Sequence, residues 1–189
     1  VSVIIPTIDN VEMLFRCVDS LLEKSNYKNL EILIADTGSS EENLEKIKNK
    51  YTQEFIKLIE YDYYHFAEIN NDVVNNHVSS DSELLLFSNN DIELVNDAIS
   101  EMVSLWSKNK KRCGTVGARL HFEDNTLQHA GIFLFGRREG ENVNLGLTHH
   151  GHRSPYTYPF ENVTGTIGNT AAFVLISKSL FKDVGMFNE

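Results

Sequence analysis

The stretch Glu83-Leu-Leu-Leu-Phe-Ser88, followed directly by Asn89-Asn90-Asp91, decides how this chain can fold. Leu84 to Phe87 is a short, continuous apolar run, which is typical of a strand buried on both faces of a parallel sheet. Open α/β sheets bind ligands at the carboxyl ends of such strands. Asp91 follows such an end, and a carboxylate is a hard oxygen ligand that can hold Mg²⁺ or Mn²⁺ against a pyrophosphate. The alternative is a simple strand-ending turn, since Asn and Asp favour turns for local hydrogen-bonding reasons.

Strands and helices are predicted to alternate over the first 112 residues. The predicted strands are Ser2–Thr7, Leu30–Ala35, Ile56–Tyr61 and Leu84–Ser88. Apolar residues at helical spacing follow each strand, from Val11, from the Ser39 region to about Tyr51, over Phe66–His77, and after Asn96. This alternation predicts an α/β fold, with a mainly parallel, Rossmann-like sheet flanked by helices.

Two helix starts carry capping signals. Asp9 or Asn10 is the expected N-cap of the first helix, because short polar side chains accept hydrogen bonds from the first free amides. Ser39 and Glu42 have the spacing of a capping box at the start of the second helix.

The pattern changes after residue 112 and predicts a mixed or antiparallel C-terminal part. Cys113–Phe122 and Gly131–Phe135 are predicted strands joined by a turn at 123–125. Residues 136–161 show little periodicity and are expected to form a long loop, either a lid that orders when a donor binds or a mobile insertion. Val174–Ile176 is predicted to be a buried strand, and Ser177–Val184 a short helix.

Composition limits the class of protein. The 189 residues suit a single domain, and the 41% hydrophobic and 23% charged content is that of an ordinary globular protein. A net charge of −10 argues against a nucleic-acid partner, because backbone binding needs a surplus of lysine and arginine. An acidic chain can still bind a nucleotide where a metal ion or helix N-termini meet the phosphates.

Cysteine usage and hydropathy favour a cytoplasmic protein. Cys17 and Cys113 form no CxxC motif and are expected to be buried, reduced thiols. The sequence shows neither a signal peptide nor an apolar run of roughly 18 residues. Both ends, at Val1 and Glu189, look cut from a longer protein, so any membrane association is expected only through segments outside this one.

The turn after the first strand excludes two common nucleotide folds. Pro6-Thr-Ile-Asp-Asn10 contains no glycine, which removes the G-x-G-x-x-G dinucleotide turn, and the chain has no P-loop motif. Polar clusters instead follow three strands, at Pro6–Asn10, Asp36–Ser40 and Asn89–Asp91. In a parallel sheet these clusters lie along one edge, where an acidic group could bind a base or ribose while Asp91 holds a metal.

Six motifs in order closely resemble the inverting family 2 glycosyltransferases, which have the GT-A fold. They are Ser2–Thr7, Asp36–Ser39 (the D-x-G-S turn), Phe66–Asn71, Asn89–Asp91 (the D-x-D motif), Gln128–Ile132 and Val184–Glu189 (the G-G-F-D-E stretch). The resemblance covers residues 1–189 as a single domain. The N-N-D form is frequent among rhamnosyltransferase-like members of this family.

The resemblance implies a nucleotide-diphospho-sugar donor and assigns residues to bind it. Pro6 and Thr7 would contact the base and ribose with Asp9 nearby. Asp36 would accept hydrogen bonds from the base or ribose, and Asn71 would help to position the nucleotide.

The resemblance also implies a reaction. Asp91 would coordinate Mg²⁺ or Mn²⁺ at the diphosphate, with Asn89 and Asn90 near the sugar or ribose. The acceptor, a hydroxyl of a glycan or lipid-linked glycan, would attack the anomeric carbon in line and invert it, with a carboxylate as general base. The expected setting is cell-surface polysaccharide synthesis at the inner face of the membrane, with residues 1–112 as the donor half and 113–189 as the acceptor half.

The sequence departs from the family pattern at three points. Asn89 replaces the first carboxylate of D-x-D, and Asn188 replaces the aspartate of F-D-E. The family's general base lies beyond the residue that matches Glu189, which leaves Glu189 itself as a weak candidate. These departures keep open a catalytically silent module that binds sugar nucleotides. A nucleotidyltransferase is a further alternative, although Pro6–Asn10 lacks its glycine-rich phosphate loop.

The histidines of the second half allow more than one interpretation. His149, His150 and His152 have a spacing that permits metal ligation, but polar loop histidines are more often solvated. His129 could line the acceptor side or pack against the sheet.

Overall fold

The computed structural model of the chain describes residues 1–139, 142–155 and 165–189. Its main sheet contains β1 (Ser2–Thr7), β2 (Glu31–Asp36), β3 (Ile56–Glu60), β4 (Leu84–Ser88), β5 (Thr115–Gly117) and β10 (Phe173–Ser177). The strand order is β3-β2-β1-β4-β10-β5. The first four strands are parallel, whereas β10 runs antiparallel to both β4 and β5. The predicted α/β fold is confirmed, including its mixed C-terminal part.

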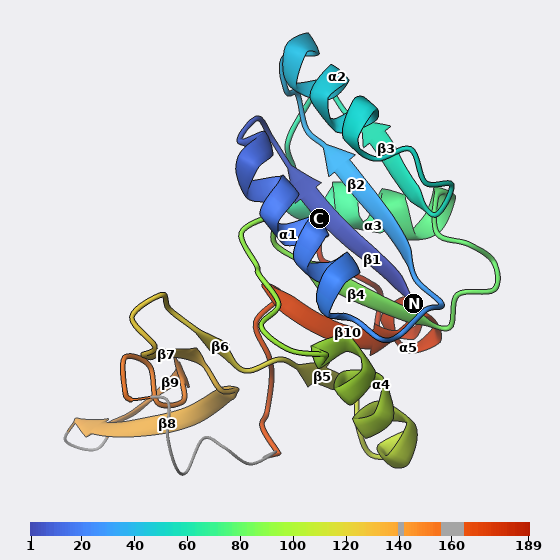
Figure 1. Cartoon of the computed structure of the whole chain (residues 1–189). Helices are drawn as coiled ribbons and strands as arrows, with labels where there is room; N and C mark the ends of the chain where they lie inside the picture. The colour runs from blue at the N-terminus through green and yellow to red at the C-terminus, as the bar shows by residue number, and fades with distance from the viewer. Residues whose placement is uncertain (140–141, 156–164) are drawn as a thin grey trace.

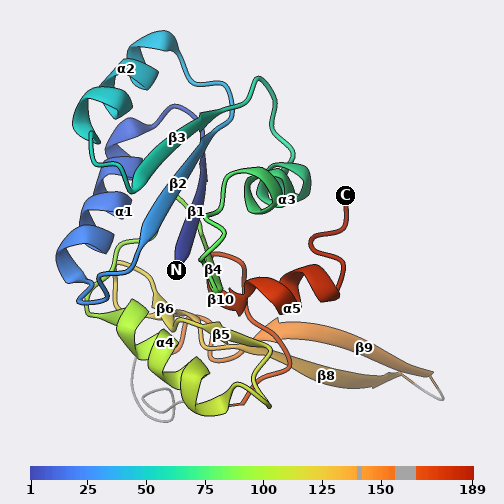
Figure 2. The same cartoon turned by 90° about the vertical axis from the view of Figure 1, so that its right-hand side faces the viewer.

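Helices cover both faces of this sheet (Figure 2). One face carries α1 (Val11–Lys24), α2 (Glu41–Lys50) and α4 (Ala98–Asn109), and the other carries α3 (Phe66–Asn76) and α5 (Lys178–Asp183). Successive residues of β1 pack alternately into the two apolar cores, because strand side chains alternate between the faces of a sheet. Val3 and Ile5 pack with α1 and α4, and Ile4 packs with α3.

The apolar run in β4 is buried on both sides, as its sequence predicts. Leu84 and Leu86 belong to the core under α1 and α4, whereas Leu85 and Phe87 belong to the core under α3 and α5. All four are at most 4% exposed, because β4 is paired with β1 on one side and β10 on the other.

The predicted helix caps are only partly correct. Asn10 occupies the N-cap position of α1, but its side chain makes no capping hydrogen bond. Ser40, not Ser39, caps α2 and accepts from the Asn43 amide at 3.4 Å. The expectation for Ser39 is wrong because its hydroxyl is bound to the Asp36 carboxylate.

The segment after α4 forms two short strands where one long strand was predicted. β5 is followed by β6 (Leu120–His121), which leaves the main sheet and pairs antiparallel with β7 (Leu127–His129). The predicted turn at 123–125 is present, with Asn125 at φ 60°, but it joins β6 to β7 instead of to residues 131–135.

Residues 132–139 and 142–149 pair as two long antiparallel strands that project away from the main sheet (Figures 1 and 2). These strands are β8 (Ile132–Glu139) and β9 (Asn142–His149). The expectation of a loop is therefore wrong for residues 136–139 and 142–149. The Phe135 ring lies over Gly146, its cross-strand partner, where an added Cβ would come within 2.7 Å of the ring. Residues 140–141 and 156–161 of the expected loop lie outside the described residues.

Leu86→Ala tests the packing of β4. We expect this change to lower the free energy of unfolding by about 2–5 kcal/mol, because it leaves a cavity in a fully buried site. Urea denaturation measures the effect. Val95→Ala, at a residue that is 68% exposed, is the matched control and should change stability by less than about 0.5 kcal/mol. Equal effects of the two changes would contradict the burial of β4.

Candidate functional site at the carboxyl edge of the sheet

Polar side chains gather where the parallel strands β1, β2 and β4 end. Thr7, after half-buried Pro6, is the register partner of Asp36 on β2. The Asn90 side-chain amide donates to the Thr7 hydroxyl at 3.0 Å, which joins the end of β1 to the loop after β4. The amide and hydroxyl of Thr37 both donate to the Thr7 carbonyl at 2.9 Å. The three predicted clusters therefore meet at one edge.

The Asp36 carboxylate holds its own turn. Asp36 is 1% exposed, and one oxygen accepts from the amides of Gly38 and Ser39 at 3.1 and 2.9 Å. The other oxygen accepts from the Ser39 hydroxyl. Gly38 has φ 112°, a left-handed conformation that glycine adopts without strain. The structure thus gives Asp36 a structural role in this turn, beside its predicted contact with a nucleotide.

Asp9 connects the β1–α1 loop to the start of α2. Its amide donates to the Ser39 hydroxyl at 2.6 Å. Its carboxylate accepts from the Asn43 side chain at 2.9 Å and from the Ser40 amide at 3.1 Å, and these contacts lower the pKa of the Asp9 carboxyl. Asp9 and Asn10 both have positive φ, 46° and 26°, which places backbone strain at this edge. Asp9 therefore helps to fix the geometry of two loops.

The loop after β4 is held through its backbone. The Asn89 amide donates to the Ala172 carbonyl at 2.9 Å, which extends the contact between β4 and β10. The Asn89 carbonyl accepts from the Ser88 hydroxyl at 2.9 Å and from the Cys17 thiol at 3.5 Å. Burial, together with the nearby Asp91 charge, raises the pKa of Cys17 to about 12, so this thiol stays protonated. Cys17 thus has a packing role.

The Asp91 carboxylate lies at this edge and remains available to bind a ligand. It is exposed, and its side chain makes no hydrogen bond or ion pair with any residue that the structure describes. The described residues also include no group of three or more His, Cys, Asp or Glu side chains that could hold a metal ion. A single carboxylate suits Mg²⁺ or Mn²⁺, which commonly takes one or two protein ligands and completes its shell with phosphate oxygens and water. The residues fit a cation held between Asp91 and a diphosphate.

Asn71 lies on α3 and binds the last residues of the chain. Its amide oxygen accepts from the Phe187 amide at 3.1 Å, and its nitrogen donates to the Phe187 carbonyl at 2.9 Å. The same nitrogen donates to the Glu189 carboxylate at 2.8 Å. Phe187 packs among Phe66, Phe87 and Phe181 with ring centroids 4.9–5.2 Å apart. The predicted nucleotide contact of Asn71 would therefore share these side-chain atoms with the C-terminal segment.

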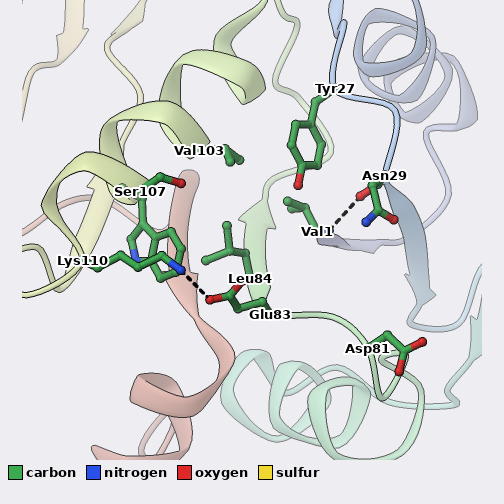
Figure 3. Close-up of a pocket in the computed structure, with 10 residues that line it drawn as sticks. Val1, Tyr27, Asn29, Asp81, Glu83, Leu84, Val103, Ser107 and Lys110 are labelled. Carbon is green, nitrogen blue, oxygen red and sulfur yellow. Dashed lines mark hydrogen bonds and ion pairs between the residues drawn. The ribbon is translucent and has the colours of Figure 1, made fainter.

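Among the described residues, one cavity lies at the opposite end of the sheet and a second lies beside the loop after β4. The larger, of about 190 Å³, lies at the amino ends of β1 and β4 and is lined by Val1, Leu84 and Trp106 (Figure 3). Lys110, which contacts Glu83 at 2.9 Å, closes one side. Its place at the opposite end of the strands separates it from the polar clusters, so its volume does not make it the candidate site. A second cavity, of about 160 Å³, lies beside His129 and Ala172.

Comparison with known proteins identifies the family. The model of glycosyl transferase family 2 matches residues 2–185, almost the whole chain. The chain belongs to glycosyl transferase family 2. The resemblance seen in the sequence motifs is therefore confirmed.

Relatives of this family 2 chain are longer than the chain itself. The O-antigen biosynthesis protein RfbC of Myxococcus xanthus is 28% identical over 201 residues, covering all of this chain and 14% of the relative. An uncharacterised protein, y4gI of Sinorhizobium fredii, is 31% identical over 204 residues and is covered to 20%. The chain thus spans a fifth or less of the length of either relative.

Solved structures share the fold at low sequence identity. The mannosyltransferase PcManGT of Pyrobaculum calidifontis, in complex with GDP-Man and Mn²⁺, matches 99% of this chain and 47% of its own with a TM-score of 0.66 and 13% identity. Residues 1–349 of S. aureus TarS match the whole chain and 50% of their own with a TM-score of 0.57 and 15% identity. These likenesses confirm the GT-A fold.

Asp36→Ala tests the structural role of the buried carboxylate. We expect a loss of about 2–4 kcal/mol in the free energy of unfolding, because a buried donor left unsatisfied costs about 1–3 kcal/mol and the change removes the acceptor of several. Chemical denaturation measures it, with Asp62→Ala at an exposed position as the control. A stability within about 0.5 kcal/mol of the parent would show that the turn does not need this carboxylate.

Proposed function

We propose that the chain is the donor-binding catalytic domain of an inverting glycosyltransferase. It would move a sugar from a nucleotide-diphospho-sugar to an acceptor hydroxyl during the synthesis of a cell-surface glycan. The observation that carries this proposal is the exposed Asp91 carboxylate, which has no partner among the described residues and lies beside the Asn90–Thr7 contact at the carboxyl edge of a GT-A sheet.

The comparisons support the proposal at the level of substrate class. The PcManGT complex contains GDP-Man and Mn²⁺, a nucleotide sugar and a divalent cation. The RfbC relative is an O-antigen biosynthesis protein, which supports a role in polysaccharide synthesis. GDP-Man, Mn²⁺ and O-antigen biosynthesis are properties of those two proteins. We propose that this chain likewise uses a nucleotide sugar and a divalent cation, and that its acceptor is a glycan or a lipid-linked glycan.

The residues at the edge divide the work of binding the donor. Pro6 and Thr7 would meet the base and ribose, and Asp36 would act there by holding the 37–40 turn or by accepting from the nucleotide. Asp91 would hold Mg²⁺ or Mn²⁺, with Asn89 and Asn90 at the sugar or ribose. When bound, the cation would neutralise charge on the departing nucleoside diphosphate.

The acceptor would approach from the side of the later strands. Asn71 and the Phe187 cluster hold Glu189 against α3, so the last residues have a fixed place beside the sheet. Asn71 would share in positioning the nucleotide, and a carboxylate general base would take the hydroxyl proton. Residues 113–189 would form this acceptor half, although β10 completes the same sheet as the donor strands.

The proposed setting is the cytoplasm, at the inner face of the membrane where lipid-linked acceptors are presented. In the described part of the chain, none of the helices has the length and hydropathy that a membrane span requires.

A second candidate is a module that binds the donor without transferring it. Asn89 and Asn188 favour it, because each stands where the family pattern has a carboxylate. Incubation with GDP-mannose, UDP-glucose or dTDP-rhamnose plus Mn²⁺, together with a methyl glycoside whose hydroxyls can accept the sugar, distinguishes the two functions. Release of nucleoside diphosphate supports catalysis, whereas donor binding without any release supports the silent module.

Calorimetry with GDP, UDP and dTDP tests the metal role of Asp91. We expect at least one of them to bind the parent at least tenfold more tightly with Mn²⁺ than with EDTA, a difference of about 1.4 kcal/mol. Asp91→Asn should remove this difference and leave the unfolding midpoint unchanged, because Asp91 is exposed and unpaired among the described residues. Asp62→Asn is the control for the loss of an exposed charge. A metal dependence that persists in Asp91→Asn would exclude Asp91 as the ligand.

A further inference from the structure

The second cavity has a lining that differs from that of the carboxyl edge of the sheet. It is bounded by Leu120, Gln128, His129, His149, His152, Thr170 and Ala172. Its volume of about 160 Å³ exceeds by at least tenfold the roughly 10–15 Å³ that a single water needs. None of these residues is Lys, Arg, Asp or Glu, so the cavity suits a neutral polar ligand better than a phosphate or an ammonium group.

The hydrogen bonds of His129 fix its tautomer. Its Nε2 accepts from the backbone amides of Gly131 and Thr170 at 3.2 and 3.3 Å. An atom that accepts from an amide carries no proton, so the proton of the neutral ring lies on Nδ1. Burial, and then the neighbouring His149, lower the pKa of His129 to about 4, which keeps the ring neutral at neutral pH.

The tautomer of His129 determines that of His149. The Nδ1 atoms of the two rings lie 3.0 Å apart, in an edge-on arrangement with centroids at 4.9 Å. Because Nδ1 of His129 carries the proton, it donates a hydrogen bond, and Nδ1 of His149 accepts that hydrogen bond. Neutral His149 therefore keeps its own proton on Nε2, as a hydrogen-bond donor. Among the described residues this nitrogen has no hydrogen-bond partner.

His152 is fixed in the opposite sense. Its Nδ1 lies 3.0 Å from the Gln128 carbonyl, which can only accept, so Nδ1 carries the proton. Neutral His152 then presents Nε2 as an acceptor, and this atom too has no partner within the described ranges. The rings of His149 and His152 lie 6.2 Å apart. Two rings that line the cavity thus carry one free donor and one free acceptor among the described residues, and each ring is held in place by its other nitrogen.

The cavity also adjoins the loop after β4, which carries Asn89 to Asp91. Ala172, part of its wall, accepts from the Asn89 amide at 2.9 Å. Asp91 follows two residues later. A ligand in the cavity would therefore lie on the β10 side of the proposed donor site.

We propose that His149 and His152 bind neighbouring hydroxyl groups of an acceptor sugar. One hydroxyl would accept from Nε2 of His149 and another would donate to Nε2 of His152, while Leu120 and Ala172 supply an apolar wall. A hydroxyl both donates and accepts, and a sugar carries several in a fixed arrangement with apolar C–H groups beside them. His129 is a positioning residue that sets the His149 tautomer. The inference rests on the proposed function, because that function supplies the acceptor.

Long-range ¹H–¹⁵N NMR of protein whose histidines are labelled with ¹⁵N tests the proposal. The probes are the methyl glycosides of mannose, glucose and rhamnose, with fully O-methylated methyl glucoside as a probe that cannot donate. We expect saturable shifts of the Nε2 signals of His149 and His152 with at least one free glycoside and none with the methylated one. Resonances that show other tautomers for His129 or His149 would overturn the proposal, as would an absence of shifts with every glycoside.

Variants separate hydrogen bonding from a general effect on the fold. His149→Ala should weaken glycoside binding at least tenfold, whereas His149→Gln, which keeps an N–H donor, should retain part of it. His152→Ala should match His149→Ala, and His77→Gln, at the distant end of α3, should change nothing. Unchanged glycoside binding in both alanine variants would overturn the proposal.

Nucleotide binding distinguishes this inference from the proposed function. GDP or UDP with Mn²⁺ should bind equally to the parent and to His149→Ala. Glycoside shifts without nucleotide binding would remove the proposed function and leave the sugar site in place. Nucleotide binding without glycoside shifts would overturn the sugar site alone.

Discussion

The parallel pairing of β1 between β2 and β4 is the constraint on which the rest of the structure depends. It brings residues some 30 and 80 positions apart in the chain to one edge, with Thr7 opposite Asp36 and the Asn89–Asp91 loop directly beside them. The pairing is stable because both faces of these strands are buried, one under α1 and α4 and the other under α3 and α5. A shift of register would misplace every polar group at the edge.

The loops at this edge hold one another in place. Asp9 binds the start of α2, Ser39 connects Asp9 to Asp36, and Asn90 binds Thr7. Most polar groups at the edge are therefore engaged with each other, and Asp91 stands apart as an exposed carboxylate. A site arranged before its ligand arrives loses less entropy on binding. In the proposed function, this arrangement would let an acidic chain bind a diphosphate, because one positioned carboxylate would recruit the cation that the phosphates need.

Local sequence patterns predicted most of the fold, but they predicted fewer of the contacts at the candidate site. The apolar run at 84–87 and the alternation of strands with helices predicted the parallel sheet, because a strand that is buried on both faces is apolar at consecutive positions. The strand structure of residues 136–139 and 142–149 was missed because the glycines of this segment suggested a loop, whereas Gly146 accommodates the Phe135 ring. The contact between Asn71 and Phe187 was missed as well, because it joins residues that lie 116 positions apart and no local pattern records it.

The most direct test of a cation-dependent nucleotide site at this edge is paramagnetic broadening of amide NMR signals by Mn²⁺ in the presence of GDP or UDP. The account predicts that the amides of Thr7, Gly38 and residues 90–92 broaden first, and only when nucleotide and Mn²⁺ are both present. Amides at the opposite cavity, such as those of Leu84 and Lys110, should remain sharp (Figure 3). Broadening centred on that cavity, or on His149 and His152, would contradict the account.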